Sequence, residues 1–192
     1  RTLGLRDNGQ LLPENPKTLA QRLAERGYAT AAFVSGYPLH STFGLDRGFA
    51  RYDDAFDLGK GDEPERKAPA TVAAARTWLA SAKSPWFLWV HLYDPHYPYE
   101  PPAAYRREGD RGAYDGEVAF ADAAIGELLR DSAPGTSETL TVFAGDHGES
   151  LGEHGEGTHG FFVYDSTILV PHGRAFAATV NPSSSSVPPH AV

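Results

Sequence analysis

The stretch Thr139 to His159 constrains the fold and the chemistry of this chain more than any other. It opens with an apolar run of β-strand character, residues 140–144, and the run stops at Gly145. Asp146 and His147 follow directly. Ligands of an open α/β sheet bind beyond the carboxyl ends of its strands, so this pair would stand at the mouth of such a site. A carboxylate oxygen and an imidazole nitrogen suit a divalent cation, although a solvated loop is the plainer alternative.

Helix and strand patterns alternate up to residue 144. Apolar residues at helical spacing predict a helix that starts at Asn15-Pro16, a second from Pro69, and a third over residues 114–128. Mostly apolar runs predict strands over residues 28–35, 86–92 and 140–144. Because each strand follows a helix, we expect parallel pairing in a three-layer α/β sandwich with a mostly parallel central sheet. Residues 172–192, which contain SSSS and several prolines, are predicted to form an irregular, low-complexity tail.

A second predicted strand also ends in polar side chains. The run over residues 86–92 is followed by YDPHYPY, in which the Asp94-Pro95 dipeptide restricts the backbone and should hold His96 in place. Alone, His96 is more simply interpreted as a loop histidine bonded to the main chain. Two strand ends with acidic and histidine residues together predict one composite site.

Two other polar segments could contribute to such a site. Asp53 and Asp54 could be cation ligands, although a solvated turn is the simpler interpretation because aspartate is common in turns. Residues 100–112, with Arg106 and Arg107, could form a substrate lid or a solvated connection, and we favour the connection.

Composition excludes several classes of function. The chain has 17 Lys and Arg against 25 Asp and Glu, a net charge of −8, which argues against binding to a nucleic-acid backbone. It has no cysteine, so neither a disulfide nor a thiol nucleophile lies within it. No apolar run is long enough for a transmembrane helix. The sequence starts at Arg1 without a methionine, and we expect its true beginning to lie upstream. Neither a cytoplasmic nor an exported location is indicated, nor an oligomeric state.

Five segments together resemble the middle part of a sulfatase, a member of the alkaline phosphatase superfamily. They cover nearly all of residues 5–171, and the DPHxPY and GDHGE motifs are the most specific parts. The resemblance makes residues 1–171 a partial, incomplete sulfatase catalytic domain with an alkaline phosphatase-like fold. The segments are PKTLAQRLAERGYATAAFVSGYPL, FGLDRGFARYDD, WFLWVHLYDPHYPYEPP, YDGEVAFADAAIGELL and VFAGDHGESLGEHGEGTHGFFVYDSTILVP.

This resemblance implies hydrolysis of a sulfate ester, on a small molecule or a glycan, with one divalent cation, calcium or magnesium. Asp146 and His147 match a metal-ligand pair of the family. His96 matches a histidine that lies close to the transferred group and the leaving oxygen. His159 occupies a position where many relatives have lysine, and would contact a sulfuryl oxygen or assist proton transfer. Glu149, like the loop residues Glu153 and His154, receives no role.

The chain also departs from the family pattern. Sulfatases begin with a strand that ends in an aspartate pair, which completes the metal site. A Cys- or Ser-x-Pro-x-Arg segment follows, whose first residue becomes formylglycine, the nucleophile. Neither feature is present in these 192 residues, and both are expected upstream of Arg1. Asp146 and His147 supply only two protein ligands, whereas calcium takes about 6–8 oxygen ligands. We therefore expect the isolated chain to lack sulfatase activity.

Two alternatives stay open. A phosphodiesterase or phosphonate monoester hydrolase of the same superfamily would use two cations, with Asp94 and His96 as ligands. The second alternative is an inactive truncated remnant that binds metal weakly. The identity of the nucleophile and the number of bound cations distinguish the first of these from a sulfatase.

Overall fold

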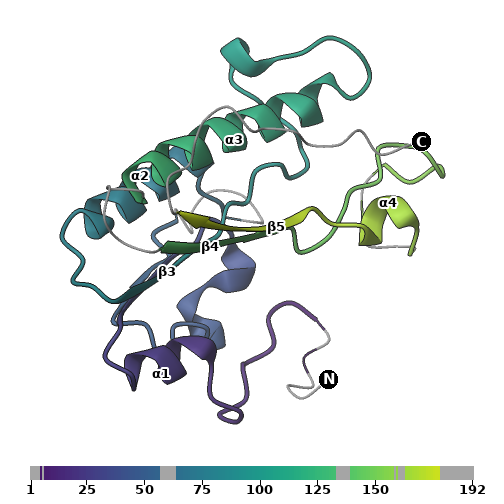
Figure 1. Ribbon diagram of the computed structural model, residues 1–192. Coiled ribbons are helices and arrows are strands. Elements are labelled where there is room, and N and C mark those ends of the chain that lie inside the picture. The colour runs from purple at the N-terminus through teal and green to yellow at the C-terminus, as the bar shows by residue number, and fades with distance from the viewer. Residues whose placement is uncertain are drawn as a thin grey trace. The chain divides into compact units, whose positions relative to one another are not determined.

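In a computed structural model of the chain, the fold is α/β (Figure 1). The structure describes residue 5 and residues 7–56, 64–132, 139–157, 159 and 163–177. The side chains of residues 131–132 and 174–177 are not described. The chain forms two compact units, residues 1–131 and residues 132–192, and each is treated by itself.

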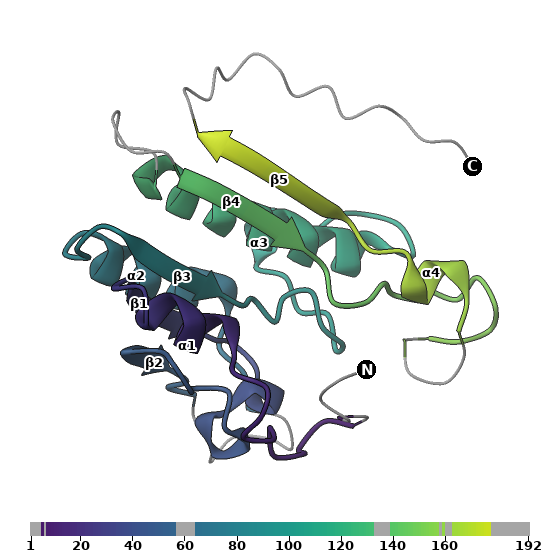
Figure 2. The same cartoon turned by 60° about the horizontal axis from the view of Figure 1, so that its bottom comes forward.

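A three-stranded parallel sheet lies at the centre of the first unit. Its strands are β1 (Ala29–Phe33), β2 (Arg51–Asp53) and β3 (Trp86–Val90), in the spatial order β2-β1-β3 (Figure 2). The register aligns Ala31 of the central strand with Arg51 on one side and with Leu88 on the other. Strand β1 is buried almost throughout, as expected for a strand that is covered on both faces.

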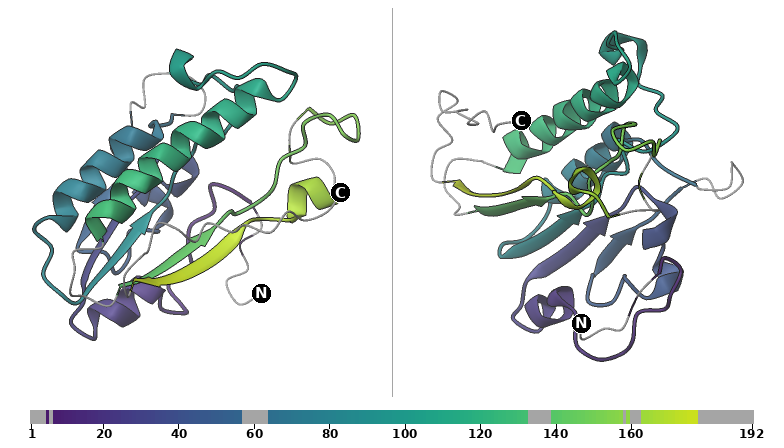
Figure 3. Two further views of the ribbon diagram at one scale, coloured as in Figure 1. Left: turned by 45° about the horizontal axis from the view of Figure 1, so that its top comes forward. Right: turned by 90° about the vertical axis from the view of Figure 1, so that its right-hand side faces the viewer.

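Helices cover both faces of this sheet. Helix α1 (Leu19–Ala24) lies on one face, and α2 (Ala68–Leu79) and α3 (Gly112–Ser132) lie side by side on the other (Figure 3). Small apolar side chains of α2 and α3 pack against one another in one buried cluster. None of the helices in the described part of the chain is both long and apolar enough to span a membrane. The buried residues between α2 and α3 are Ala68, Val72, Ala121 and Ala124, and those between the sheet and α2 are Ala31, Phe33 and Ala75.

This arrangement confirms the predicted α/β sandwich with a parallel sheet, while the start of the first helix was predicted wrongly. Thr18, not Asn15, caps α1, because its hydroxyl accepts the amide of Gln21 at 3.1 Å and the Gln21 side chain accepts the amide of Thr18 at 2.8 Å. Gly48 lies against this turn with φ of +93°, and a Cβ there would come within 2.2 Å of the Gln21 nitrogen. The glycine therefore permits the close approach.

The second unit contains β4 (Thr139–Ala144), α4 (Asp165–Ile168) and β5 (His172–Ala177). Strand β4 pairs antiparallel with β5, from Thr139 opposite Ala177 to Ala144 opposite His172. The parallel pairing predicted for this strand is thus not the pairing observed. Strand β5 falls within the segment that was predicted to be irregular. The prediction missed this strand because pairing with β4, rather than an apolar pattern of its own, makes it a strand. Residues 178–192 of that segment lie outside the described residues.

A buried ion pair joins the end of β2 to the segment before α2. The guanidinium of Arg66 donates to Asp53 Oδ1 at 2.6 Å, to Thr71 Oγ1 at 2.9 Å and to the Val34 carbonyl at 3.1 Å. Burial alone would raise the pKa of Asp53, but hydrogen bonds from Arg66 and from Arg51 outweigh it and hold the pKa below its ordinary value.

The acidic pair at positions 53 and 54 therefore has structural contacts. Asp53 is buried, so the expectation of a solvated turn is wrong for this residue. Asp54 accepts the amide of Ser41 at 2.8 Å through Oδ2, which ties the preceding loop to the strand end. Both carboxylates are thus occupied by donors of the first unit itself.

We predict that Asp53→Asn lowers the free energy of unfolding at pH 7 by about 3 kcal/mol, because it leaves the buried Arg66 without its counter-charge. The folded-state pKa of Asp53 is lowered, so its stabilisation is present above the unfolded pKa of about 4 and is lost as the pH falls through the folded value. Denaturant unfolding from pH 7 to pH 2 should show the two proteins converging in acid. Glu25→Gln, at an exposed ion pair with Lys17, is the control and should leave the midpoint unchanged. A constant difference at all pH values would contradict the assignment.

Candidate active site

The segment after β3 positions His96 through Tyr93. The two rings stack with their centroids 4.1 Å apart, and the Tyr93 hydroxyl lies 3.0 Å from His96 Nε2. His96 is half-buried. The prediction that His96 is held in place by local structure is consistent with these contacts.

Asp94, two positions before His96, is buried and contacts the start of α2. Its Oδ2 accepts the amide of Ala68 at 2.7 Å, which caps α2 where Lys67 provides no side-chain cap. Its Oδ1 lies 3.3 Å from the ammonium of Lys67. Burial raises the pKa of Asp94 in spite of the attraction of Lys67.

Two residues of the first unit that received no role in the sequence lie against this segment. Glu117, on α3, is 1% exposed and accepts the amides of His96 and Glu100, each at 3.1 Å. The ammonium of Lys67 lies 3.3 Å from Glu117 Oε1. Burial alone would lower the pKa of Lys67, but its carboxylate neighbours raise it above the ordinary value. No local sequence pattern predicts these contacts. A glutamate within an otherwise apolar helix stripe does indicate a buried carboxylate that needs partners.

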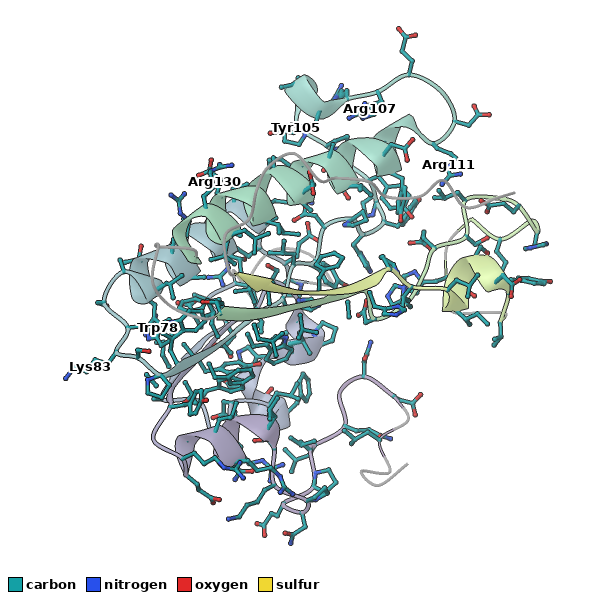
Figure 4. The ribbon with its side chains drawn as sticks, in the orientation of Figure 1. Trp78, Lys83, Tyr105, Arg107, Arg111 and Arg130 are labelled. Carbon is teal, nitrogen blue, oxygen red and sulfur yellow. The ribbon has the colours of Figure 1, made fainter. Side chains whose placement is uncertain are left out.

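The segment before α3 is a structured connection. Residues Ala103–Tyr105 form a short 3-10 helix, and the ring of Tyr105 packs edge-on against Phe120 with centroids 5.2 Å apart. Arg107 is exposed. Figure 4 shows Tyr105 and Arg107 near the start of α3 and Arg130 toward its other end. The choice between a connection and a substrate lid stays a prediction.

In the second unit, Asp146 and His147 follow β4 after one glycine, Gly145, and are open to solvent. Their side chains are 77% and 44% exposed. The His147 amide donates to Asp146 Oδ1 at 3.0 Å, and its Nδ1–H donates to the carbonyl of Gly148 at 2.7 Å. A donor bond at Nδ1 leaves a lone pair on Nε2, as in a metal-binding histidine.

These two residues fit part of a divalent-cation site. His147 Nε2 and Asp146 Oδ1 are 3.9 Å apart. A cation that lies about 2.1 Å from an imidazole nitrogen and about 2.4 Å from a carboxylate oxygen can contact both. Among the residues that the structure describes, no group of three or more His, Cys, Asp or Glu is arranged to hold a metal. The pair would therefore supply only some of the ligands.

His159 lies against this pair and is held by Glu149. The rings of His147 and His159 are 3.9 Å apart between centroids. His159 Nδ1 is 3.1 Å from Glu149 Oε1 and 3.2 Å from Oε2, and the Glu149 side chain is only 6% exposed. A buried carboxylate against Nδ1 fixes the orientation of an imidazole. Sequence analysis assigned no role to Glu149, because this residue and His159 are separated by ten positions.

Close contact with α4 shapes the loop that carries these side chains. The Gly148 amide donates to the Thr167 carbonyl at 2.8 Å, and a Cβ at Gly148 would lie 2.0 Å from the Ser166 carbonyl oxygen. His154 stacks on Tyr164 with centroids 4.0 Å apart, which gives it a structural contact. The loop therefore depends on a glycine at this position.

The predicted site residues fall in two groups. Asp146, His147 and His159 are neighbours in the second unit, whereas His96 belongs to the first. The composite site that we expected from two strand ends stays a prediction.

Comparisons with known proteins agree with this architecture. The sequence pattern of the sulfatase family matches residues 3–172. A solved 2-O GAG sulfatase shares 16% identity over 91% of this chain and 50% of its own, with a TM-score of 0.64. A protein solved in complex with its substrate D-glucosamine-2-N,6-O-disulfate shares 16% over 90% of this chain and 58% of its own, with a TM-score of 0.68. The phosphonate monoester hydrolase of Agrobacterium radiobacter shares 16% over 87% of this chain and 54% of its own, with a TM-score of 0.63.

These matches differ in what they establish. No curated protein matches the chain. The chain spans about half the length of the solved structures cited above, and at 16% identity they establish the alkaline phosphatase-like fold alone. The family match, by contrast, includes both strand ends and the loop up to His159. The chain belongs to the sulfatase family.

Proposed function

We propose that the protein to which these residues belong hydrolyses a sulfate ester with a single divalent cation, calcium or magnesium. Membership of the sulfatase family suggests a hydrolase. The sulfate ester, the single cation and the residue roles are the proposal. One observation supports the proposal most. The aspartate after β4 is exposed, whereas the aspartate after β3 is buried beside a lysine.

The end of β4 is suited to a cation, and the end of β3 is not. Asp146 and His147 are exposed, with an oxygen and a nitrogen lone pair 3.9 Å apart. Asp94 is buried, caps α2 through Oδ2 and has the Lys67 ammonium 3.3 Å from Oδ1. A divalent cation at Asp94 would meet the positive charge of Lys67 at short range. This contrast supports one cation site, as in a sulfatase, over the two sites of the phosphodiesterase alternative.

The chain's own residues have distinct roles in this proposal. Asp146 and His147 bind the cation. His96, held by Tyr93, contacts the transferred group and the leaving oxygen. His159 donates a hydrogen bond to a sulfuryl oxygen, and Glu149 holds its ring by accepting at Nδ1.

Two components come from outside the described residues. When bound, a divalent cation polarises the sulfuryl oxygens and offsets negative charge in the transition state. We propose that a formylglycine in another segment of the protein is the nucleophile, since these 192 residues contain no cysteine and no Ser-x-Pro-x-Arg. The substrate class is a sulfated small molecule or glycan. One similar solved structure contains a disulfated glucosamine, and this sugar is therefore a suitable test substrate.

We predict that the complete protein hydrolyses an aryl sulfate or a sulfated sugar, and that a chelator abolishes turnover until calcium or magnesium is restored. His96→Ala should lower kcat by about 10²- to 10³-fold, the usual loss when a side chain that stabilises charge developing in the transition state is removed. The control Lys83→Ala changes an exposed residue between α2 and β3 and should be neutral. Faster turnover of a phosphonate monoester or phosphodiester, with two bound cations per chain, would favour the alternative instead.

The 192-residue chain alone should show no aryl sulfate turnover above that of its His96→Ala variant. It should still bind calcium weakly, with a Kd of about 1 mM or higher, because two protein ligands are few for this ion. NMR titration should shift the signals of residues 146 and 147, and Asp146→Asn should abolish the shifts. Asp122→Asn, at an exposed position on α3, is the matched control. Calcium shifts that survive Asp146→Asn would remove this residue from the site.

Glu149→Gln in the complete protein should lower kcat by about 10- to 100-fold, as expected for a residue that orients another. The glutamine can place only one oxygen where the carboxylate places two against Nδ1. In the His159→Ala background the same change should have little further effect, because its action passes through His159. Additive losses in kinetic assays would show that Glu149 acts in another way.

A further inference from the structure

Glu117 is a carboxylate buried in the middle of helix α3. Its residue exposure is 1%, so it has lost nearly all contact with water. Burial of a charged side chain is costly unless other groups replace its hydration. The helix stripe around it is otherwise formed by small apolar residues such as Ala121 and Ala124. An acidic residue at this position therefore requires a specific set of partners.

Three donors from two other segments meet the two oxygens of Glu117. Oε2 accepts the His96 amide at 3.1 Å. Oε1 accepts the Glu100 amide at 3.1 Å and the Lys67 ammonium at 3.3 Å. Only a carboxylate accepts at both of its oxygens. A glutamine would place an NH₂ group, itself a donor, against the donors at one of the two positions. The geometry is specific for glutamate rather than for any polar residue.

The two amides lie at the two ends of the segment that carries His96. Between them, Pro98 has no N–H, as is true of Pro95 just before, so this stretch has few donors for hydrogen bonds of its own. An external acceptor therefore fixes the main chain at both ends. The ring of His96 is fixed separately by Tyr93.

A glycine next to Glu117 brings the following part of the same loop onto the helix. A Cβ at Gly116 would lie 2.6 Å from the Tyr105 carbonyl oxygen and 2.9 Å from the Pro101 side chain. Any other residue at position 116 would push this loop away from α3. Two neighbouring residues of α3 thus hold the loop. Glu117 binds it through a buried carboxylate, and Gly116 allows its backbone to come close to the helix.

We propose that Glu117 is a positioning residue for His96, with Lys67 as its counter-charge. Its carboxylate sets the position of the His96 main chain, and Tyr93 then sets the ring, so the imidazole is placed before a substrate arrives. Fixed placement of a reacting group is worth large factors in rate, because the entropy of ordering it is lost in advance. The catalytic part of this inference rests on the proposed role of His96. The positioning part does not.

The first experiment measures positioning in the 192-residue chain by NMR. In the unchanged chain, a scalar coupling across the hydrogen bond should link the His96 amide nitrogen to the Glu117 carboxylate carbon. Glu117→Gln should remove the coupling at one of the two amides, His96 or Glu100, and raise hydrogen exchange there by about tenfold or more. The matched control is Glu127→Gln, on the same helix at an exposed ion pair with Arg76, and should alter neither amide.

Each result of this experiment decides the question. Exchange at both amides that is unchanged in Glu117→Gln would overturn the proposal. Should Glu117→Gln fail to fold, the coupling in the unchanged chain decides, and its absence at both amides would overturn the proposal as well. Glu117→Asp, which keeps the charge on a shorter side chain, should fold and shift both amide signals.

The second experiment measures catalysis in the complete protein. Glu117→Gln should lower kcat by about tenfold or more while KM changes little, because the substrate still binds but His96 is less well placed. In the His96→Ala background, Glu117→Gln should cause no further loss. An equal further loss would show that Glu117 does not act through His96. A His96→Ala enzyme with normal kcat would refute the proposed role of His96 and leave the NMR result standing.

Discussion

A hydrogen bond from the Ala68 amide to the Asp94 carboxylate joins the end of β3 to the start of α2, and the layout of the first unit depends on it. The bond gives α2 an acceptor at its N-terminus, where Lys67 offers no side-chain cap. The same amide and the positive charge of Lys67 offset part of the hydration that Asp94 loses on burial. Glu117 shares that ammonium, so β3, α2 and α3 meet at one charged cluster.

The acidic residues near the strand ends differ in burial and in their partners. Asp53, Asp94 and Glu117 are buried, and each lies beside an arginine or a lysine of the first unit. Asp146 is 77% exposed, and its Oδ1 accepts the amide of its neighbour His147. A carboxylate that is paired with a lysine or arginine binds a metal ion poorly, because the two cations repel each other. An exposed carboxylate without such a partner is available to a metal ion. This difference is the physical basis of our proposal that a cation binds after β4.

Most helices and strands could be predicted because their signals are local. The mainly apolar run at residues 86–92 predicted β3, and helical spacing predicted α3, since burial of such residues favours those periods. The misplaced start of α1 and the missed strand β5 have other causes. The α1 cap depends on mutual bonds between Thr18 and Gln21, and β5 is a strand because β4 pairs with it. Pairing of this kind is a property of two segments.

The sequence by itself determined the family, the alternation of helices and strands, and the adjacent pair Asp146-His147, because each of these is written in neighbouring residues. Tertiary structure alone decided the roles of Glu149 and Glu117. Glu149 meets a histidine ten positions away, and Glu117 meets an amide 21 positions away and a lysine 50 positions away. Whether an acidic residue binds a cation, caps a helix or holds a loop depends on burial and on the donors that folding brings to it, and neither is present in a list of residues.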